Sequence, residues 1–156
     1  MEIRNATVVE IPQILKLLVQ VNMVHHNGRP DLFKGPATKY GEKELRKLLR
    51  DDTRPVFVCM DGEVLLGYAF CILKEVKNDQ LLENCKTLYV DDLCVDETCR
   101  GTGVGKALMT HAVQFAKGSG CHNVTLNVWS FNENAMRFYE SFGMHEQRRT
   151  MELLLG

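Results

Sequence analysis

The chain has 156 residues, of which 45% are hydrophobic and 25% are charged. Chains of roughly 100–200 residues usually form one domain, and this composition argues against disorder, collagen and coiled coil. The 19 lysines and arginines nearly balance the 20 aspartates and glutamates, so the net charge is −1. That balance argues against a protein held to nucleic acid by attraction to phosphates. We therefore expect a single domain over residues 1–156 with no nucleic-acid partner.

Hydropathy and cysteine usage indicate where such a protein works. The apolar stretch Val64–Leu73 is about half as long as the ~20 residues that a membrane helix needs. The first residues, Met1 to Arg4, contain no apolar stretch of signal-peptide length. The six cysteines include no C-x-x-C pair, which is typical of reduced, mostly buried thiols. We expect a cytoplasmic protein without membrane contact.

The first half of the chain contains alternating strand and helix patterns. A strand is predicted over residues 2–9, and apolar residues at helical spacing predict a helix over about residues 12–23. Three leucines among charges indicate a short second helix near residues 45–49. Asp61-Gly62 lies between two apolar runs and suits the positive φ angles of a tight turn, which predicts a hairpin. We expect its arms at residues 56–60 and 64–76, a loop at 78–84 and the next strand at 86–95.

The second half alternates helices and strands. One helical face runs from Val104 to Ala116 and ends at a glycine pair, and the alternating residues 124–128 predict a half-buried strand. A short helix is expected over residues 135–142, and one or two final strands over residues 144–155. The order β-α-α-β-β-β-α-β-α-β predicts an α/β fold (an α+β mixed sheet) with helices on its faces.

The most informative stretch is a glycine-rich loop between the strand at 86–95 and the following helix. It contains three alternate glycines, flanked by Arg100 and Lys106. Glycines allow close approach of the backbone to a ligand, and the unpaired N–H groups of a helix N-terminus attract an anion. The pattern therefore predicts a phosphate-binding loop; the alternative is a connector that binds nothing.

The loop fits neither common nucleotide-binding pattern. The P-loop pattern G-x-x-x-x-G-K-[ST] fails because Arg100 stands at the first glycine and Ala107 follows Lys106. The dinucleotide pattern G-x-G-x-x-G fails because its third glycine would fall on Lys106 or Leu108.

Three ordered segments resemble the GNAT superfamily of N-acetyltransferases. The loop resembles its R-x-x-G-x-G signature, residues 89–96 are similar to its fourth strand, and residues 132–144 are similar to its second motif, N-x-x-A-x-x-[LF]-Y-x-x-x-G-[FM]. The resemblance is specific over about residues 86–145 and agrees in element order elsewhere. It implies the acyl-CoA N-acyltransferase fold and one N-acetyltransferase domain, with a CoA-binding core at about 86–145.

The resemblance also implies acetyl-CoA as cosubstrate and a set of contacts for it. The pyrophosphate would be held by Arg100, Gly101, Thr102, Gly103, Val104, Gly105 and Lys106. The pantetheine arm would lie along Leu93, Cys94 and Val95, in a gap between the fourth and fifth strands, with its amide near Asn132. No Cys/His cluster has the spacing of a zinc site, so no metal is expected.

The implied reaction is direct attack of a primary amine on the thioester in a ternary complex. Tyr139 matches the residue that acts as general acid toward the leaving thiolate; its alternative role is that of one more apolar-face residue. Asp91 or Asp92 would help to deprotonate the amine. Strand alternation points them to opposite faces unless a bulge intervenes, and Asp91 is the first choice. A solvated or ion-paired carboxylate is the alternative. Catalysis by Cys94 or Cys99 is not expected.

The acceptor is the least defined part of the prediction. Candidate contacts lie in the stretch after the first helix: His25, His26, Arg29, Asp31 and Phe33. Adjacent aspartates favour a cationic amine, which could belong to a small molecule or a peptide. The alternative function is a non-catalytic acyl-CoA-binding regulatory module. A homodimer formed through the last strands is a possible assembly that rests on the resemblance.

Overall fold

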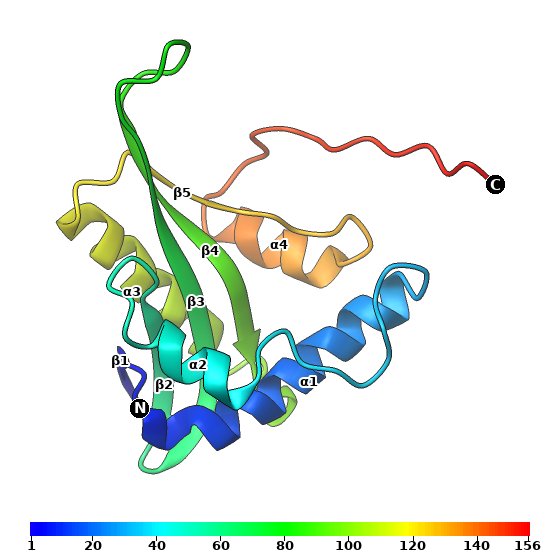
Figure 1. Cartoon of the computed structure of the whole chain (residues 1–156). Helices are drawn as coiled ribbons and strands as arrows, with labels where there is room; N and C mark the ends of the chain where they lie inside the picture. The colour runs from blue at the N-terminus through cyan, green and yellow to red at the C-terminus, as the bar shows by residue number, and fades with distance from the viewer.

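The computed structural model describes residues 1–156, which form one five-stranded sheet in the order β1-β2-β3-β4-β5 (Figure 1). The first four strands are antiparallel to their neighbours, and β5 joins β4 in parallel. The strands are β1 (Glu2–Asn5), β2 (Val56–Asp61), β3 (Val64–Val76), β4 (Cys85–Val95) and β5 (Asn123–Leu126). The helices are α1 (Ile11–Gly28), α2 (Glu42–Leu48), α3 (Val104–Gly118) and α4 (Glu133–Ser141), with short 3-10 helices η1 (Val8–Glu10) and η2 (Glu97–Cys99).

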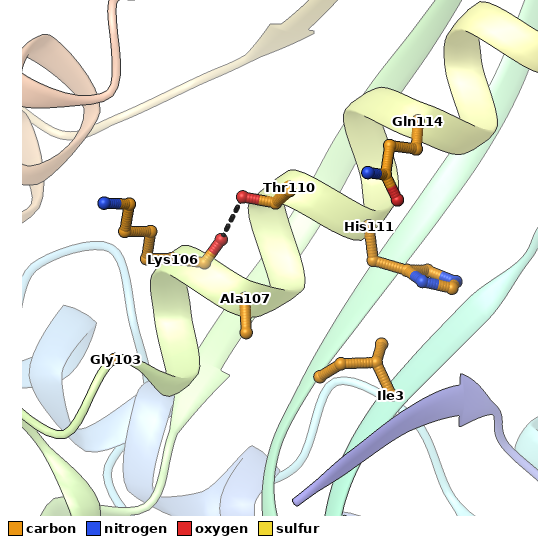
Figure 2. Close-up of a pocket in the computed structure, with 7 residues that line it drawn as sticks. All are labelled: Ile3, Gly103, Lys106, Ala107, Thr110, His111 and Gln114. Atoms are coloured by element: carbon orange, nitrogen blue, oxygen red, sulfur yellow. Dashed lines mark hydrogen bonds between the residues drawn. The ribbon is translucent and has the colours of Figure 1, made fainter.

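The sheet separates two hydrophobic cores. Along β2, Val58 and its alternate neighbours pack against α1 and α2, whereas Phe57 and Cys59 pack against α3 on the opposite face. Ile3 of β1 lies beside the first turns of α3 (Figure 2). Figure 1 shows α1 and α2 on one side of the sheet and α3 on the other. No helix is long and apolar enough to cross a membrane.

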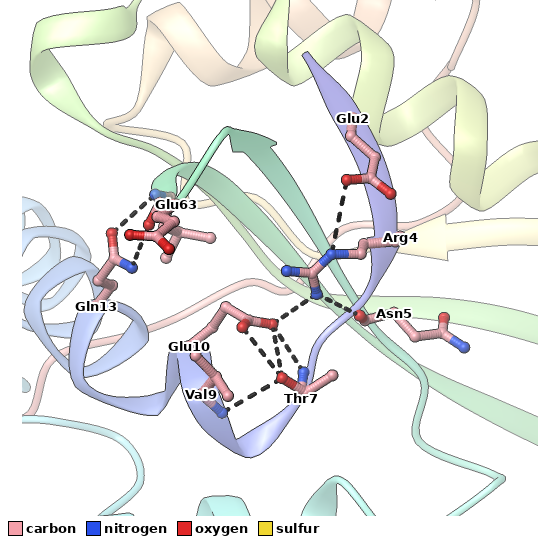
Figure 3. A network of polar contacts seen from close by, with 9 residues as sticks. Glu2, Arg4, Asn5, Thr7, Val9, Glu10, Gln13 and Glu63 are labelled. Carbon is pink, nitrogen blue, oxygen red and sulfur yellow. Dashed lines mark hydrogen bonds and ion pairs between the residues drawn. The ribbon is translucent and has the colours of Figure 1, made fainter.

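A polar network fixes the start of α1 (Figure 3). Glu10 is only 2% exposed, and it accepts hydrogen bonds from Arg4 at 2.7 Å and from the Thr7 N–H at 2.9 Å. Burial opposes ionisation of Glu10, but these bonds outweigh it and lower its pKa. Gln13 ties the next turn to the β2–β3 hairpin, because it donates to the Glu63 carbonyl and accepts from the Leu65 N–H.

The sequence predicts the first nine principal elements in the correct order. The hairpin turn at Asp61-Gly62 is confirmed, with a φ of +59° at Gly62. α1 is longer than expected, since it continues beyond Met23 to Gly28. The expected first strand is shorter, because it ends at Asn5.

The expected strands over residues 144–155 are wrong. Residues 145–156 are extended, but no strand is assigned there and their backbone makes no backbone hydrogen bond. A strand requires a partner along its edge, and nothing else in this chain pairs with these residues.

Candidate active site

The loop between η2 and α3 presents a row of free backbone donors. The N–H groups of Arg100 through Lys106 donate to no protein acceptor, and the first bond of α3 is from Ala107 to the Gly103 carbonyl. Gly101 and Gly103 have φ angles of +79° and +88°, which side-chain-bearing residues rarely adopt. This row, together with the α3 N-terminus, fits an anionic group such as a pyrophosphate.

A shallow pocket of about 410 Å³ extends from this loop along the side of α3 that faces β1 (Figure 2). Its lining combines loop and helix residues with one residue of β1: Ile3, Gly103, Lys106, Ala107, Thr110, His111 and Gln114. In Figure 2 the Lys106 side chain points away from His111, on the exposed side of the first turn. The pocket therefore continues the surface of the glycine-rich loop.

β4 and β5 are paired over only part of β4. Their last pair is Val90 with Leu126, and β4 then continues to Val95 with β3 alone. The edge at Leu93, Cys94 and Val95 that would face β5 therefore has no strand beside it and leads toward the glycine loop. An extended ligand arm can pair with such an edge as an added strand does. Asn132 begins α4, where its Oδ1 accepts from the Ala135 N–H at 3.3 Å.

A β-bulge places both aspartates on one side of the sheet. Asp92 pairs with Phe70 and Val90 pairs with Cys71, so Asp91 is the extra residue of β4. The Asp92 carboxylate accepts from the Tyr68 hydroxyl at 2.8 Å, and the Asp91 carboxylate accepts from the Tyr40 hydroxyl at 3.1 Å.

Both tyrosine rings pack against Phe70, with centroids 4.8 Å away for Tyr68 and 5.5 Å for Tyr40. The two carboxylates therefore meet tyrosines of the same core. The bulge replaces the strict alternation that would have separated Asp91 from Asp92.

The two carboxylates differ in their charge partners. Lys39, which is 48% exposed, lies 2.7 Å from Asp91 and compensates its charge. Burial lowers the pKa of Lys39, but the hydrogen bond and the charge of Asp91, together with the charges of Tyr40 and Asp92, outweigh burial and raise that pKa. Burial raises the pKa of Asp92 to about 6, although the Tyr68 hydrogen bond and the charge of Lys39 oppose the rise. Asp92 therefore changes its charge near pH 6.

Tyr139 of α4 lies in the same electrostatic environment. Burial raises its pKa to about 12, and the negative charge of Asp92 adds to the rise. Its hydroxyl has no hydrogen-bond partner in the protein. Tyr139 is thus a protonated phenol at neutral pH, free to donate a hydrogen bond to a ligand.

Cys94 is poorly suited to nucleophilic attack. Its thiol is buried and contacts the Leu17 carbonyl at 3.7 Å. Burial raises its pKa to about 12, so the reactive thiolate is scarce at neutral pH. Cys99 is half-buried next to Thr98, whose hydroxyl lies 3.6 Å from its sulfur.

An aromatic cluster connects the end of α1 with the segment that follows β5. Phe33 lies 5.0 Å from His25 and 5.6 Å from Trp129, whose ring stacks on Phe131 at 6.0 Å. Burial and, secondarily, the charge of Lys39 lower the pKa of His25. Trp129 is 38% exposed, which leaves part of this surface open to a ligand.

The other polar residues expected near the acceptor bond to protein groups. Arg29 pairs with Asp31 at 2.8 Å and with Glu152 at 2.9 Å, and the His26 ring lies 2.8 Å from the Phe33 carbonyl. The sequence analysis missed five residues of this region: Lys39, Tyr40, Tyr68, Trp129 and Phe131. Tyr68 carried a usable signal, since a tyrosine inside an apolar strand usually needs a partner for its hydroxyl.

The model of the Acetyltransferase (GNAT) family matches residues 22–144. This chain belongs to the GNAT family. The crystal structure of a mutant BH1408 protein from Bacillus halodurans has a TM-score of 0.95 with this GNAT chain, at 32% identity over 99% of each chain. The resemblance to the family and the mixed-sheet fold predicted from the sequence are both confirmed.

Two curated relatives are named N-acetyltransferases. An uncharacterized N-acetyltransferase of Methanocaldococcus jannaschii is 27% identical over 145 residues, which are 93% of this chain but 61% of that protein. Thialysine N-epsilon-acetyltransferase of Bos taurus is 28% identical over 137 residues, which are 88% of this chain and 74% of that protein. This GNAT chain thus spans less than two thirds of the Methanocaldococcus relative.

Proposed function

We propose that residues 1–156 form one N-acetyltransferase domain that transfers the acetyl group of acetyl-CoA to a primary amine. The proposal rests on one observation: the glycine-rich loop, the open edge of β4 and Asp92 follow one another along the structure. The free N–H groups of Arg100 to Lys106 lead to the open edge of β4 at 93–95, and that edge begins beside Asp92. The arrangement suits a ligand with an anionic end, an extended arm and a reactive tip.

The contacts for acetyl-CoA follow from this arrangement. The backbone of the 100–106 loop would bind the pyrophosphate, helped by the exposed cations Arg100 and Lys106. Leu93, Cys94 and Val95 would pair with the pantetheine arm through their backbone, and Asn132 would contact its amide. When bound, acetyl-CoA supplies an activated acetyl thioester.

Asp92 is the better base of the two carboxylates. A free alkylamine has a pKa near ~10 and must lose a proton before or during attack. Asp92 has a pKa of about 6, so it is mostly ionised at neutral pH and still able to take a proton, directly or through water. Asp91 is held by Lys39 and Tyr40 and would position the acceptor side of the site.

Tyr139 would act as the general acid. The leaving thiolate has a parent thiol pKa of roughly 8.5, whereas Tyr139, with a pKa of about 12, keeps its proton until the thiolate needs it. Because the Cys94 thiol is buried and protonated, direct attack in a ternary complex needs fewer activated groups than a covalent acyl-enzyme.

The acceptor would enter beside the aromatic cluster of His25, Phe33, Trp129 and Phe131, and its amine would approach the carboxylate pair. The name of the Bos taurus relative specifies an N-epsilon amine, which supports a primary amine as acceptor. Both a small molecule and a peptide suit this surface. The second candidate function, a regulatory module that binds acyl-CoA without turnover, is less favoured because Tyr139 and Asp92 are both present.

The experiment that tests the proposal has two stages. Calorimetric titration with acetyl-CoA, NAD and ATP should give binding of acetyl-CoA alone; failure to bind it in the presence and absence of pooled amines would refute the loop assignment. Chromatographic detection of free CoA with an amine panel then measures turnover without interference from the six cysteines. Binding without turnover on any primary amine would favour the regulatory module.

A further inference from the structure

Lys39 holds a primary amine at the carboxylate pair. Its Nζ lies 2.7 Å from Oδ2 of Asp91, and the Tyr40 hydroxyl donates to the same oxygen at 3.1 Å. Lys39 belongs to the segment between α1 and α2, 52 residues before Asp91 in the chain. The fold therefore brings an alkylamine of the chain itself to the place where an acceptor amine would meet Asp91 and Asp92.

The Lys39 side chain is both held and accessible. It is 48% exposed, although the ion pair fixes its nitrogen. Its positive charge also acts on Asp92, where it favours the ionised carboxylate. The other ion-paired lysine, Lys77, bonds to Glu75 near the end of β3 at 3.5 Å. Lys39 is thus the lysine that combines access from solvent with a contact to the carboxylate pair.

The ion pair makes the reactivity of Lys39 depend on a base. The hydrogen bond and charge of Asp91 help to raise the pKa of Lys39, so its amine is protonated at neutral pH. A protonated amine has no lone pair for attack, and its proton must be removed as the reaction proceeds. Asp92, with a pKa of about 6, is the neighbouring carboxylate that can take that proton.

We propose that Lys39 is a site of self-acetylation, at which its amine takes the acetyl group of acetyl-CoA bound to the same chain when no acceptor is present. This inference rests on the proposed function. The Lys39 nitrogen forms a bond to the acetyl carbon, and the carbon–sulfur bond breaks. Asp92 takes the amine proton, directly or through water, and Tyr139 gives its proton to the leaving thiolate. The products are an acetylated Lys39 and CoA.

Acetylation changes the site that it modifies. An acetylated lysine has no charge and forms no salt bridge, so Asp91 loses its cation and keeps the hydrogen bond from Tyr40. The added acetyl group also lies at the carboxylate pair, where an acceptor amine would enter. Self-acetylation therefore slows turnover, and a saturating acceptor protects Lys39 because both amines compete for one place.

Incubation with acetyl-CoA alone, followed by peptide mass spectrometry, tests the proposal. Lys39 should be acetylated before Lys43, an exposed lysine of α2 without an ion pair. The N-hydroxysuccinimide ester of acetic acid, which needs no enzyme, should give the reverse order, because the ion pair keeps Lys39 protonated. The same order with both reagents would overturn the proposal.

Three variants separate catalysed transfer from background reactivity. Lys39→Arg keeps a cation for Asp91 but offers no nucleophilic amine, so acetyl-CoA should leave this position unmodified. Tyr139→Phe should slow acetylation of Lys39 by roughly 10²–10⁴-fold. The matched control Lys43→Arg should acetylate Lys39 at the wild-type rate. Acetylation of Lys39 at an unchanged rate in Tyr139→Phe would show that the site plays no part in it.

A mixing experiment identifies the chain that supplies the lysine. When wild type is mixed with isotopically labelled Tyr139→Phe, acetyl groups should appear on Lys39 of the unlabelled chain; equal labelling of both would refute transfer within one chain. The amine panel distinguishes two failures. Turnover of a free amine with Lys39 unmodified refutes self-acetylation alone, whereas no reaction with any amine or lysine refutes the proposed function itself.

Discussion

Replacing Tyr68 by phenylalanine discriminates between the two candidate bases. The ring keeps its packing against Phe70, but the hydroxyl that donates to Asp92 at 2.8 Å is lost. A hydrogen bond to a charged group contributes about 1.5–3 kcal/mol, and one pKa unit corresponds to about 1.4 kcal/mol. The substitution should therefore raise the pKa of Asp92 by about 1–2 from its value of about 6.

The assay is the pH dependence of kcat/KM, which reports the ionisation of the free enzyme. A base must be ionised to act, so activity should rise as the pH increases through the pKa of Asp92. This rise is the acidic limb of the pH profile. In the wild type the acidic limb lies near pH 6, and in Tyr68→Phe it should move to about pH 7–8. Activity on the alkaline side of both limbs should be similar.

The matched control is Tyr40→Phe, which removes the 3.1 Å hydrogen bond to Asp91 and leaves Asp92 bonded. Its limb should stay at the wild-type pH. If Tyr40→Phe shifts the limb and Tyr68→Phe does not, Asp91 is the base. If neither variant shifts it, the titrating group is neither carboxylate and the assignment is refuted.

Three other variants test the remaining parts of the site. Tyr139→Phe should keep acetyl-CoA affinity by calorimetry and lower kcat by roughly 10²–10⁴-fold; unchanged kcat would remove the phenol from the mechanism. Gly103→Val should weaken acetyl-CoA binding, whereas the control Gly120→Val, at a φ of +76° beyond the end of α3, should affect stability and leave affinity unchanged. Asp92→Asn should increase the free energy of unfolding above pH ~7 by up to about 3 kcal/mol. The pKa of Asp92 is ~3.9 in the unfolded chain and about 6 in the folded protein, so its ionisation opposes folding as the pH rises between these values. Asparagine cannot ionise and avoids this loss. Asp91→Asn loses the Lys39 pair and should give no such gain in urea unfolding at the same pH.

The glycine-rich loop before α3 could be identified from the sequence because all of its determinants are local. Three glycines, two cations and a helix start lie within residues 100–106, so their spacing alone specifies a row of free N–H groups. The positive φ angles at Gly101 and Gly103 agree with that prediction. The hairpin at Asp61-Gly62 was predictable for the same reason.

The carboxylate site depends on contacts that are distant in sequence. The bulge at Asp91 is defined by the register of β4 against β3, and a sequence pattern of period two cannot reveal a single inserted residue. Lys39 and Tyr40 come from the segment before α2, 52 and 51 residues away from Asp91. The sequence therefore identified the two aspartates but not the partners that make them different.

The final strands illustrate a second limit. Alternation in residues 144–155 correctly indicated an extended backbone, but pairing is a property of two edges. Residues 145–156 lie in no sheet and make no backbone hydrogen bond, so the periodic pattern has no partner strand to satisfy it.

The bulge also explains how one sheet holds two carboxylates side by side. Two neighbouring aspartates on the same face would repel each other, and each would lose hydration. Lys39 neutralises Asp91, whereas the second carboxylate of the pair, Asp92, forms no ion pair. The ionised form of Asp92 is stabilised by a hydrogen bond from one side chain, that of Tyr68. The structure thus concentrates the energetic penalty on Asp92, whose pKa burial raises to about 6. A pKa of about 6 would suit the base role proposed for Asp92, because a relaxed carboxylate with a pKa near ~4 would be a weaker acceptor of the amine proton.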